Sequence, residues 1–196
     1  MKEPINNQRW LDAQNGEKIY HEKDTVDSSL EMYRNSYNYY FKYLNINPDL
    51  NQKSVVEIGP ARIAGLLFCT NYSKSYIIEP TPYDGIDHLY QNKNLEVIKE
   101  KAETCNFPDV DEVWILNLMQ HVQDPDKLIN IAKKHSKIIR FFEPIDLPTN
   151  NEHPYSFSEQ DYKNYFGNCV KIYNSCGEPG FHGAKCVYGI FETNKS

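Results

Sequence analysis

The most constraining feature of the sequence is a buried strand that ends in a small-residue turn, within residues 54–68. Residues 55–58 (Val-Val-Glu-Ile) are β-branched apart from one acid, which is the pattern of a strand covered on both faces. Gly59 and Pro60 end this run, and apolar residues at helical spacing follow over 63–67. The segment therefore predicts a strand, a tight turn and a helix, with backbone N–H groups at the turn open to a ligand.

A second predicted strand, residues 75–79, ends in Glu79, which lies twenty residues beyond Gly59. In nucleotide-binding α/β folds, an acid at this offset reaches the tip of the neighbouring strand and hydrogen-bonds ribose hydroxyls. The turn and Glu79 together indicate a nucleoside-containing cofactor. A Gly-x-Gly-x-x-Gly dinucleotide motif and a Walker-type phosphate loop are both absent from the sequence.

Residues 55–61 (Val-Val-Glu-Ile-Gly-Pro-Ala) resemble the first motif of the class I S-adenosylmethionine-dependent methyltransferases, in their small-molecule, type 11-like group. Glu79 falls where that family has its ribose-binding acid. Further similar segments follow in the family's order: Ala102-Glu103 ahead of residues 107–108, then 114–126, then 153–158. The resemblance covers residue 54 to the C-terminus and implies S-adenosylmethionine as the cofactor.

The resemblance also implies roles for individual residues. Contacts with the cofactor would come from Glu57, Gly59, Pro60, Ala61, Glu79, Ala102, Glu103, Asn117 and Leu118. Glu79 would bind both ribose hydroxyls, Glu103 would lie beside the adenine, and Asn117 would face the methionine part. Glu57 would orient the turn, or the cofactor's amino group through its neighbours. The alternative for Glu57 is a carboxylate that only accepts backbone N–H bonds.

Three residues depart from the family's pattern. The usual acid-x-Gly-x-Gly-x-Gly becomes Glu57-x-Gly59-x-Ala61-x-Ile63, and Lys101 replaces an acid often found before the Ala-Glu pair. Ala61 adds a methyl group where backbone approaches the ligand, and the bulkier Ile63 is acceptable only if its side chain faces the core. These changes keep a second hypothesis open, that of a catalytically inactive Rossmann-like binding or scaffold protein.

The order of the predicted elements favours a doubly wound α/β fold. Strands are expected at 55–58, 75–79, 95–98, 112–116, 137–142, 169–174 and 185–192, and helices at 8–16, 27–45, 83–90, 124–134 and 158–165. This alternation predicts a Rossmann-like, mostly parallel sheet, and the resemblance implies seven strands with an antiparallel C-terminal pair. At 196 residues we expect a single domain, with a helical cap over 1–50 and the core over 51–196.

Composition limits the partners and the compartment. The formal net charge of −6 disfavours a broad nucleic-acid surface, and no apolar run approaches the ~20 residues of a membrane span. The N-terminus has no apolar core of a signal peptide, and five scattered cysteines are typical of reduced thiols, so we expect a cytoplasmic protein. The expected acceptor is a small polar molecule, such as a sugar or another metabolite.

His121, just past the predicted fourth strand, is the histidine best placed to act as a general base in methyl transfer. Packing or a helix cap is the alternative for it. Four residues follow the fifth strand and would line either a substrate pocket or a solvated loop: Glu143, Asp146, His153 and Tyr155. The N-terminal helices offer Trp10, Tyr33 and Tyr37, either for core packing or for a lid that contacts the ligand.

Three cysteines and one histidine near the C-terminus are residues of zinc-ligand type. The residues concerned are Cys169, Cys176, His182 and Cys186. Their spacing matches none of the usual paired-ligand patterns, and the first and last fall in predicted strands. We therefore expect buried thiols and no metal site.

Overall fold

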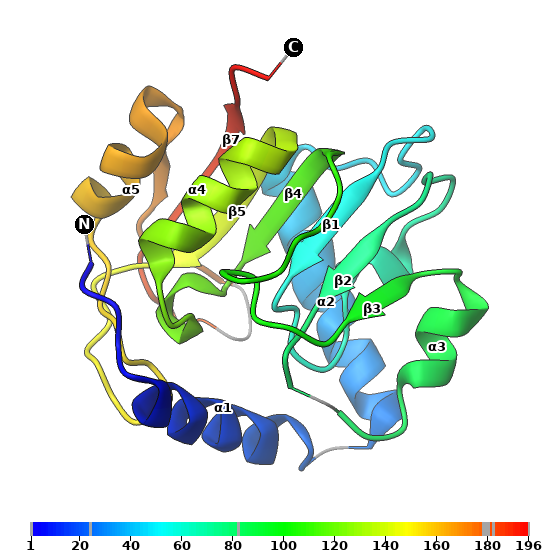
Figure 1. The fold of residues 1–196 in the computed structure, drawn as a ribbon, viewed down its shortest axis with the longest axis horizontal. Coiled ribbons are helices and arrows are strands. Elements are labelled where there is room, and N and C mark those ends of the chain that lie inside the picture. Colours follow the sequence, from blue (N-terminus) through cyan, green and yellow to red (C-terminus); the bar gives the residue numbers. More distant parts are fainter. Residues whose placement is uncertain (1, 24, 82, 178–180, 182, 196) are drawn as a thin grey trace.

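A seven-stranded sheet with the order β3-β2-β1-β4-β5-β7-β6 forms the centre of the molecule (Figure 1). The computed structural model describes residues 2–23, 25–81, 83–177, 181 and 183–195. The strands are β1 (Val55–Ile58), β2 (Tyr76–Ile78), β3 (Glu96–Ile98), β4 (Val110–Leu116), β5 (Ser136–Pro144), β6 (Lys171–Tyr173) and β7 (Cys186–Glu192). The first five run parallel, and β7 is antiparallel to both β5 and β6. The predicted Rossmann-like fold class is confirmed.

Helices cover both faces of this sheet and its lower edge. They are α1 (Asn7–His21), α2 (Val26–Leu44), α3 (Asp87–Asn92), α4 (Pro125–His135) and α5 (Glu159–Phe166), with short 3₁₀ turns η1 (Gly65–Phe68), η2 (Met119–His121) and η3 (Gly167–Cys169). In Figure 1, α4 and α5 lie in front of the sheet and α2 lies behind it. The first helix, α1, crosses the edge toward which the parallel strands point. That edge is where ligands bind in open α/β sheets.

Side-chain caps define the ends of several helices. Ser158 and Asp161 form a reciprocal capping box at the start of α5. Helix α2 is capped by Thr25 and begins one residue before the predicted start at 27, and its C-cap, Asn45, has a left-handed conformation. Helix α3 begins only at Asp87, because Gly85 has a φ of 76° and interrupts the helix expected from residue 83.

The helix expected after β1 over residues 63–67 is wrong. Ala64 is extended, and only the single 3₁₀ turn η1 follows it. The backbone N–H groups that would continue a helix are bound elsewhere, because Ala64 donates to the Tyr90 hydroxyl and Gly65 to the Glu57 carboxylate. Ile63 is fully buried in the core on the α2 face, so its bulk stays away from the turn.

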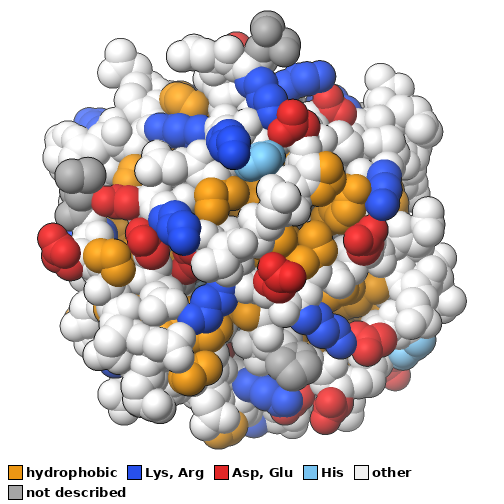
Figure 2. Space-filling view, viewed as in Figure 1, with side chains coloured by type: hydrophobic (Ala, Val, Ile, Leu, Met, Phe, Trp, Pro, Cys, Tyr) orange, Lys and Arg blue, Asp and Glu red, His pale blue; other side chains and the backbone are white. Residues whose placement is uncertain are grey.

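The cysteines, the helix lengths and the surface charge can each be compared with what the sequence predicts. Four of the five cysteines are buried, and none forms a disulfide. His182 and Pro82 lie outside the described residues. Across the described chain, no helix is both long and apolar enough to cross a membrane. Figure 2 shows basic and acidic side chains mixed over the face that α4 covers, with no broad field of one sign there.

Candidate functional site

A cavity of about 640 Å³ lies between α1 and the carboxyl ends of the parallel strands. Its lining includes eight of the nine residues that the sequence assigns to the cofactor: Gly59, Pro60, Ala61, Glu79, Ala102, Glu103, Asn117 and Leu118. His121 lines it as well. The cavity is within the range of small-molecule sites, which are concave and largely preformed.

The turn after β1 brings backbone to the wall of the cavity. Gly59 has a φ of 58°, and a Cβ atom there would lie 2.3 Å from the Leu118 side chain. The left-handed conformation favours glycine here, and any larger residue would also have to displace the Leu118 side chain. Ala61 has a φ of 56°, and its N–H donates to Glu79 Oε2 at 3.1 Å.

Glu57 lies behind this turn and does not line the cavity. One oxygen accepts from the Tyr37 hydroxyl at 2.6 Å and from Gly65 N at 2.9 Å, and the other accepts from Leu66 N at 2.9 Å. Burial raises the pKa of Glu57 against the effect of these donors. Glu57 therefore forms no part of the cavity wall. It accepts backbone N–H bonds from η1, which is the alternative that the sequence left open for it.

Glu79, in contrast, faces the cavity while it shapes the same turn. Its Oε1 accepts from Thr81 N at 2.9 Å and its Oε2 from Ala61 N at 3.1 Å. Ionised or protonated, the carboxyl group has more hydrogen-bonding positions than these two bonds use, which leaves capacity for a ligand's hydroxyl groups. Burial raises the pKa of Glu79 to about 8, because the charged form is poorly solvated there.

The adjoining part of the wall is formed by residues 101–103. Glu103 Oε1 accepts from the backbone N–H groups of Gln123 and Asp124 at 2.7 and 3.1 Å. Lys101 Nζ donates to the side chains of Asn7 and Gln123 and lies 3.8 Å from the centroid of the Trp10 ring. The lysine that replaces the family's acid therefore ties α1 to this wall through a cation–π contact.

A second buried acid supports the wall after β4. Glu143 accepts from the N–H groups of Leu118 at 2.9 Å and Met119 at 3.1 Å, and burial raises its pKa to about 8. The expectation that Glu143 lines the pocket is wrong, because its carboxylate is turned to the backbone beneath the turn. Asp146 and Tyr155 are likewise absent from the lining, and only His153 of that group of four reaches the cavity.

His121 lies beside two ionisable groups that the sequence does not connect with it. Its Nδ1 is 3.6 Å from Glu17 Oε1, and His153 Nε2 is 3.7 Å from the same oxygen. Burial lowers the pKa of His121 to about 4, so its ring is neutral at pH 7. Sequence analysis missed Glu17 because it ends the first helix at residue 16, whereas α1 continues to His21.

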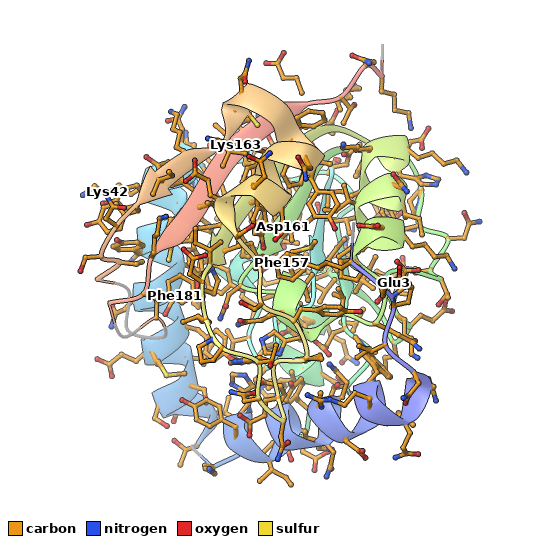
Figure 3. The ribbon with its side chains drawn as sticks, turned by 90° about the vertical axis from the view of Figure 1, so that its left-hand side faces the viewer. Glu3, Lys42, Phe157, Asp161, Lys163 and Phe181 are labelled. Atoms are coloured by element: carbon orange, nitrogen blue, oxygen red, sulfur yellow. The ribbon has the colours of Figure 1, made fainter. Side chains whose placement is uncertain are left out.

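Aromatic side chains complete the cavity on the side of the N-terminal helices. Trp10, Tyr33 and Tyr37 all line it, so the lid alternative for these residues has the geometry it needs. Phe181, labelled beside α2 in Figure 3, closes the wall with its ring centroid 6.1 Å from that of Tyr40. The cavity thus joins a polar, strand-end wall to an aromatic one.

Comparisons by sequence find no matching family model and no curated protein that matches. Comparisons of structure find many. The 1,6-didemethyltoxoflavin-N1-methyltransferase of Burkholderia thailandensis, with bound 1,6-didemethyltoxoflavin and S-adenosylhomocysteine, gives a TM-score of 0.63 at 11% identity over 99% of this chain and 94% of its own. The N-methyltransferase NodS of Bradyrhizobium japonicum gives 0.60 at 12% identity over 84% and 98%. The chain has the fold of the S-adenosylmethionine-dependent methyltransferases.

A third structural match shows that this fold is not confined to one reaction. The [4+2]-cyclase SpnF gives a TM-score of 0.60 at 9% identity, covering 82% of this chain and 80% of its own. At such identities the likeness concerns the fold alone, and function must be argued from the site.

Proposed function

We propose that the protein transfers a methyl group from S-adenosylmethionine to a small polar acceptor. The observation that carries this proposal is the cavity itself, which joins the ends of β1, β2 and β4 and has Glu79 on its wall. Gly59 presents backbone without a side chain, and Glu79 retains hydrogen-bonding capacity. These are the properties that a nucleoside with a ribose diol requires.

Within that proposal, each part of the wall has a task. Glu79 would hold the ribose, Ala102 and Glu103 would lie beside the adenine, and Asn117 with Leu118 would face the methionine part. When bound, the cofactor supplies an electrophilic methyl group on a sulfonium centre. The protein's own contribution is alignment and exclusion of water, for which α1 and the aromatic wall close the cavity.

His121 is the proposed catalytic residue. Its ring lines the cavity in the neutral form, which is the form able to accept a proton from an acceptor. A pKa of about 4 makes it a weak base, so it suits a proton that becomes acidic only as the new bond forms. Glu17, 3.6 Å from Nδ1, would stabilise the imidazolium that results.

A second candidate function is that of a catalytically inactive Rossmann-like binding or scaffold protein. Lys101 favours it, because this lysine stands where the family often has an acid and is held by Asn7, Gln123 and the Trp10 ring. Under this hypothesis the cavity would bind neither the cofactor nor its demethylated product.

Calorimetry with S-adenosylhomocysteine separates the two. We expect the wild type to bind, and Glu79→Ala to lose roughly 1.5–3 kcal/mol, which is about 10- to 150-fold in affinity. Glu96→Ala, at an exposed acid on neighbouring β3, is the matched control and should bind as the wild type does. If the wild type does not bind S-adenosylhomocysteine, the proposed cofactor is wrong. If Glu79→Ala binds it with unchanged affinity, Glu79 is not part of the site.

The acceptor class is tested separately. We expect no appreciable, salt-sensitive affinity for DNA or RNA in filter-binding experiments, because such affinity depends on released counterions at a basic surface. Strong binding that weakens steeply with salt would contradict a small-molecule acceptor.

A further inference from the structure

Three side chains of metal-ligating type meet on the cavity wall although they are far apart in the sequence. They are Glu17 on α1, His121 in η2 and His153 in the loop that follows β5. One potential ligand atom from each lies within 4.8 Å of the other two, and no other such group occurs in the part of the chain that the structure describes. The imidazole rings of His121 and His153 are 4.7 Å apart and meet edge to face.

We propose that Glu17, His121 and His153 bind one divalent transition-metal ion of the zinc type at the cavity wall. Two histidine nitrogens and one carboxylate oxygen are a ligand set that suits zinc and its neighbours in the first transition row. With three protein ligands, a tetrahedral ion keeps one position for water or for a substrate oxygen. This proposal goes beyond methyl transfer and does not depend on cofactor binding. When the ion is bound, His121 is a ligand and cannot also be the base of the proposed methyl transfer, because its free lone pair is then used.

The distances suit such an ion. Two ligands about 2.0–2.2 Å from a tetrahedral centre are about 3.3–3.6 Å from each other. Glu17 Oε1 is 3.6 Å from His121 Nδ1 and 3.7 Å from His153 Nε2. The carboxylate oxygen is therefore nearly at ligand spacing from both histidines, and only the two rings need to move closer.

The carboxylate is oriented by its second oxygen. His21 Nε2 is 3.1 Å from Glu17 Oε2, and the Nδ1 atom of the same ring is 2.9 Å from the Tyr33 hydroxyl. A chain of this kind, from ligand to outer partner, fixes ligand orientation in metal sites. Gln14, one turn before Glu17 on α1, donates to the backbone oxygen of His121 at 3.1 Å and so holds the helix against η2.

One ligand atom has no other partner to lose. His121 Nδ1 is buried and makes no hydrogen bond with the described residues, so it can bind an ion when the ring proton is on Nε2.

The bound ion would face the acceptor side of the cavity. Glu17 and both histidines line the same cavity as Glu79, together with the aromatic wall from the N-terminal helices. An ion here would attract a hydroxyl or carboxylate oxygen of a small ligand and orient it. We infer a substrate class with an oxygen donor at that end.

The test is titration of the metal-free protein. After treatment with a chelator, the full chain is titrated with ZnCl₂ by calorimetry and with CoCl₂ by absorption spectroscopy. We expect one zinc ion per chain, and cobalt bands of a four-coordinate nitrogen–oxygen site without sulfur-to-metal charge transfer. Glu17→Gln and His153→Asn should each weaken zinc binding by at least tenfold. His135→Asn is the matched control, because His135 pairs with a single carboxylate, Asp109, at 3.0 Å and has no second histidine beside it.

Each result of these titrations either supports or contradicts the metal site. Circular dichroism and the melting temperature first establish that each variant is folded. If Glu17→Gln, on helix α1, does not fold, His153→Asn, in a loop, tests the site in its place. A zinc-dependent rise in the wild-type melting temperature that is lost in His153→Asn would support the site without any activity measurement. No stoichiometric zinc binding by the wild type would overturn it. So would equal affinity in the variants and the wild type, or a cobalt spectrum dominated by thiolate ligands.

Discussion

The cavity has a strand-end wall, formed where β1, β2 and β4 end, and an α1 wall, formed by side chains of α1. The two walls are held in place by different kinds of contact. The strand-end wall is held by buried carboxylates that accept backbone N–H groups, Glu57 beneath the first turn and Glu143 beneath the turn after β4. The α1 wall is held by side chains from a helix that buries only Trp10 and Ala13. The first wall belongs to the core of the fold, whereas the second rests on it through a few polar contacts.

This difference separates a fixed part of the site from an adjustable one. A wall defined by buried acids and left-handed turns is preorganised, as recognition of one constant ligand requires. A helix with Leu11, Ile19 and Tyr20 exposed depends on fewer contacts and can open at lower cost. Under the proposed function, the strand-end wall would bind the cofactor and α1 would contact the acceptor.

The largest expected effect comes from removing an acid of the strand-end wall. Glu57→Ala would leave three buried donors, Tyr37 and the N–H groups of Gly65 and Leu66, without their acceptor. Each unsatisfied group costs about 1–3 kcal/mol, so the free energy of unfolding should fall by about 3 kcal/mol or more. Urea denaturation measures it, with Glu31→Ala at an exposed position of α2 as the control. A loss below about 1 kcal/mol would mean that the turn does not depend on this acid.

The second effect is a fall in stability as the pH rises. Burial raises the pKa of both Glu79 and Glu143 to about 8 in the folded protein, above the ordinary value of an unfolded glutamate. The folded state therefore holds protons that the unfolded state releases, and their contribution is lost as pH rises toward 8. Between pH 6.5 and 8, each group should lower the free energy of unfolding by up to about 1.4 kcal/mol per pH unit.

The two walls differ in the sign of this pH effect. Glu17 on α1 has a lowered pKa, so its contribution is present above its unfolded pKa and is lost only in acid. Glu143→Gln should therefore flatten the slope between pH 6.5 and 8, and Glu17→Gln should leave it unchanged. Urea titrations at several pH values measure both slopes. Equal slopes in the wild type and Glu143→Gln would contradict the assignment.

The sequence predicted the strand-end wall far better than the α1 wall, for a physical reason. Residues 55–61 and Glu79 carry their roles in local patterns, a β-branched run, a glycine turn and an acid at a strand end. Glu17, His121 and His153 meet only through the packing of α1 across the sheet edge, which no local pattern encodes. The helix expected over 63–67 failed because a tertiary contact, the Glu57 carboxylate, takes the N–H groups that a helix would use.

The third effect concerns the α1 wall alone. Gln14→Ala removes the hydrogen bonds to the backbone oxygen of His121 and to the Thr81 hydroxyl. Each is worth about 0.5–1.5 kcal/mol, so amide exchange in α1 should accelerate by about 5- to 150-fold while β4 and β5 keep their protection. Hydrogen exchange followed by mass spectrometry measures this. Equal acceleration in α1 and in the central strands would mean that α1 opens only with the whole fold.

The smallest effect tests the altered glycine motif of the strand-end wall. Ala61 and Gly59 both have positive φ, 56° and 58°, but only Gly59 has no room for a Cβ atom. A left-handed backbone costs alanine roughly 1–2 kcal/mol, and glycine avoids this cost. Glycine, however, gives up roughly 0.5–1 kcal/mol of stability because its unfolded chain has more conformational entropy. Ala61→Gly should therefore raise the free energy of unfolding by up to about 1 kcal/mol, with S-adenosylhomocysteine affinity kept or improved.

Gly59→Ala, the matched reversal, should lower stability and affinity together, because the new methyl group displaces Leu118 from the cavity wall. If Ala61→Gly destabilised the protein, the methyl group of Ala61 would be a packing element of the turn, and the departure from the family's glycine would be a feature of this site.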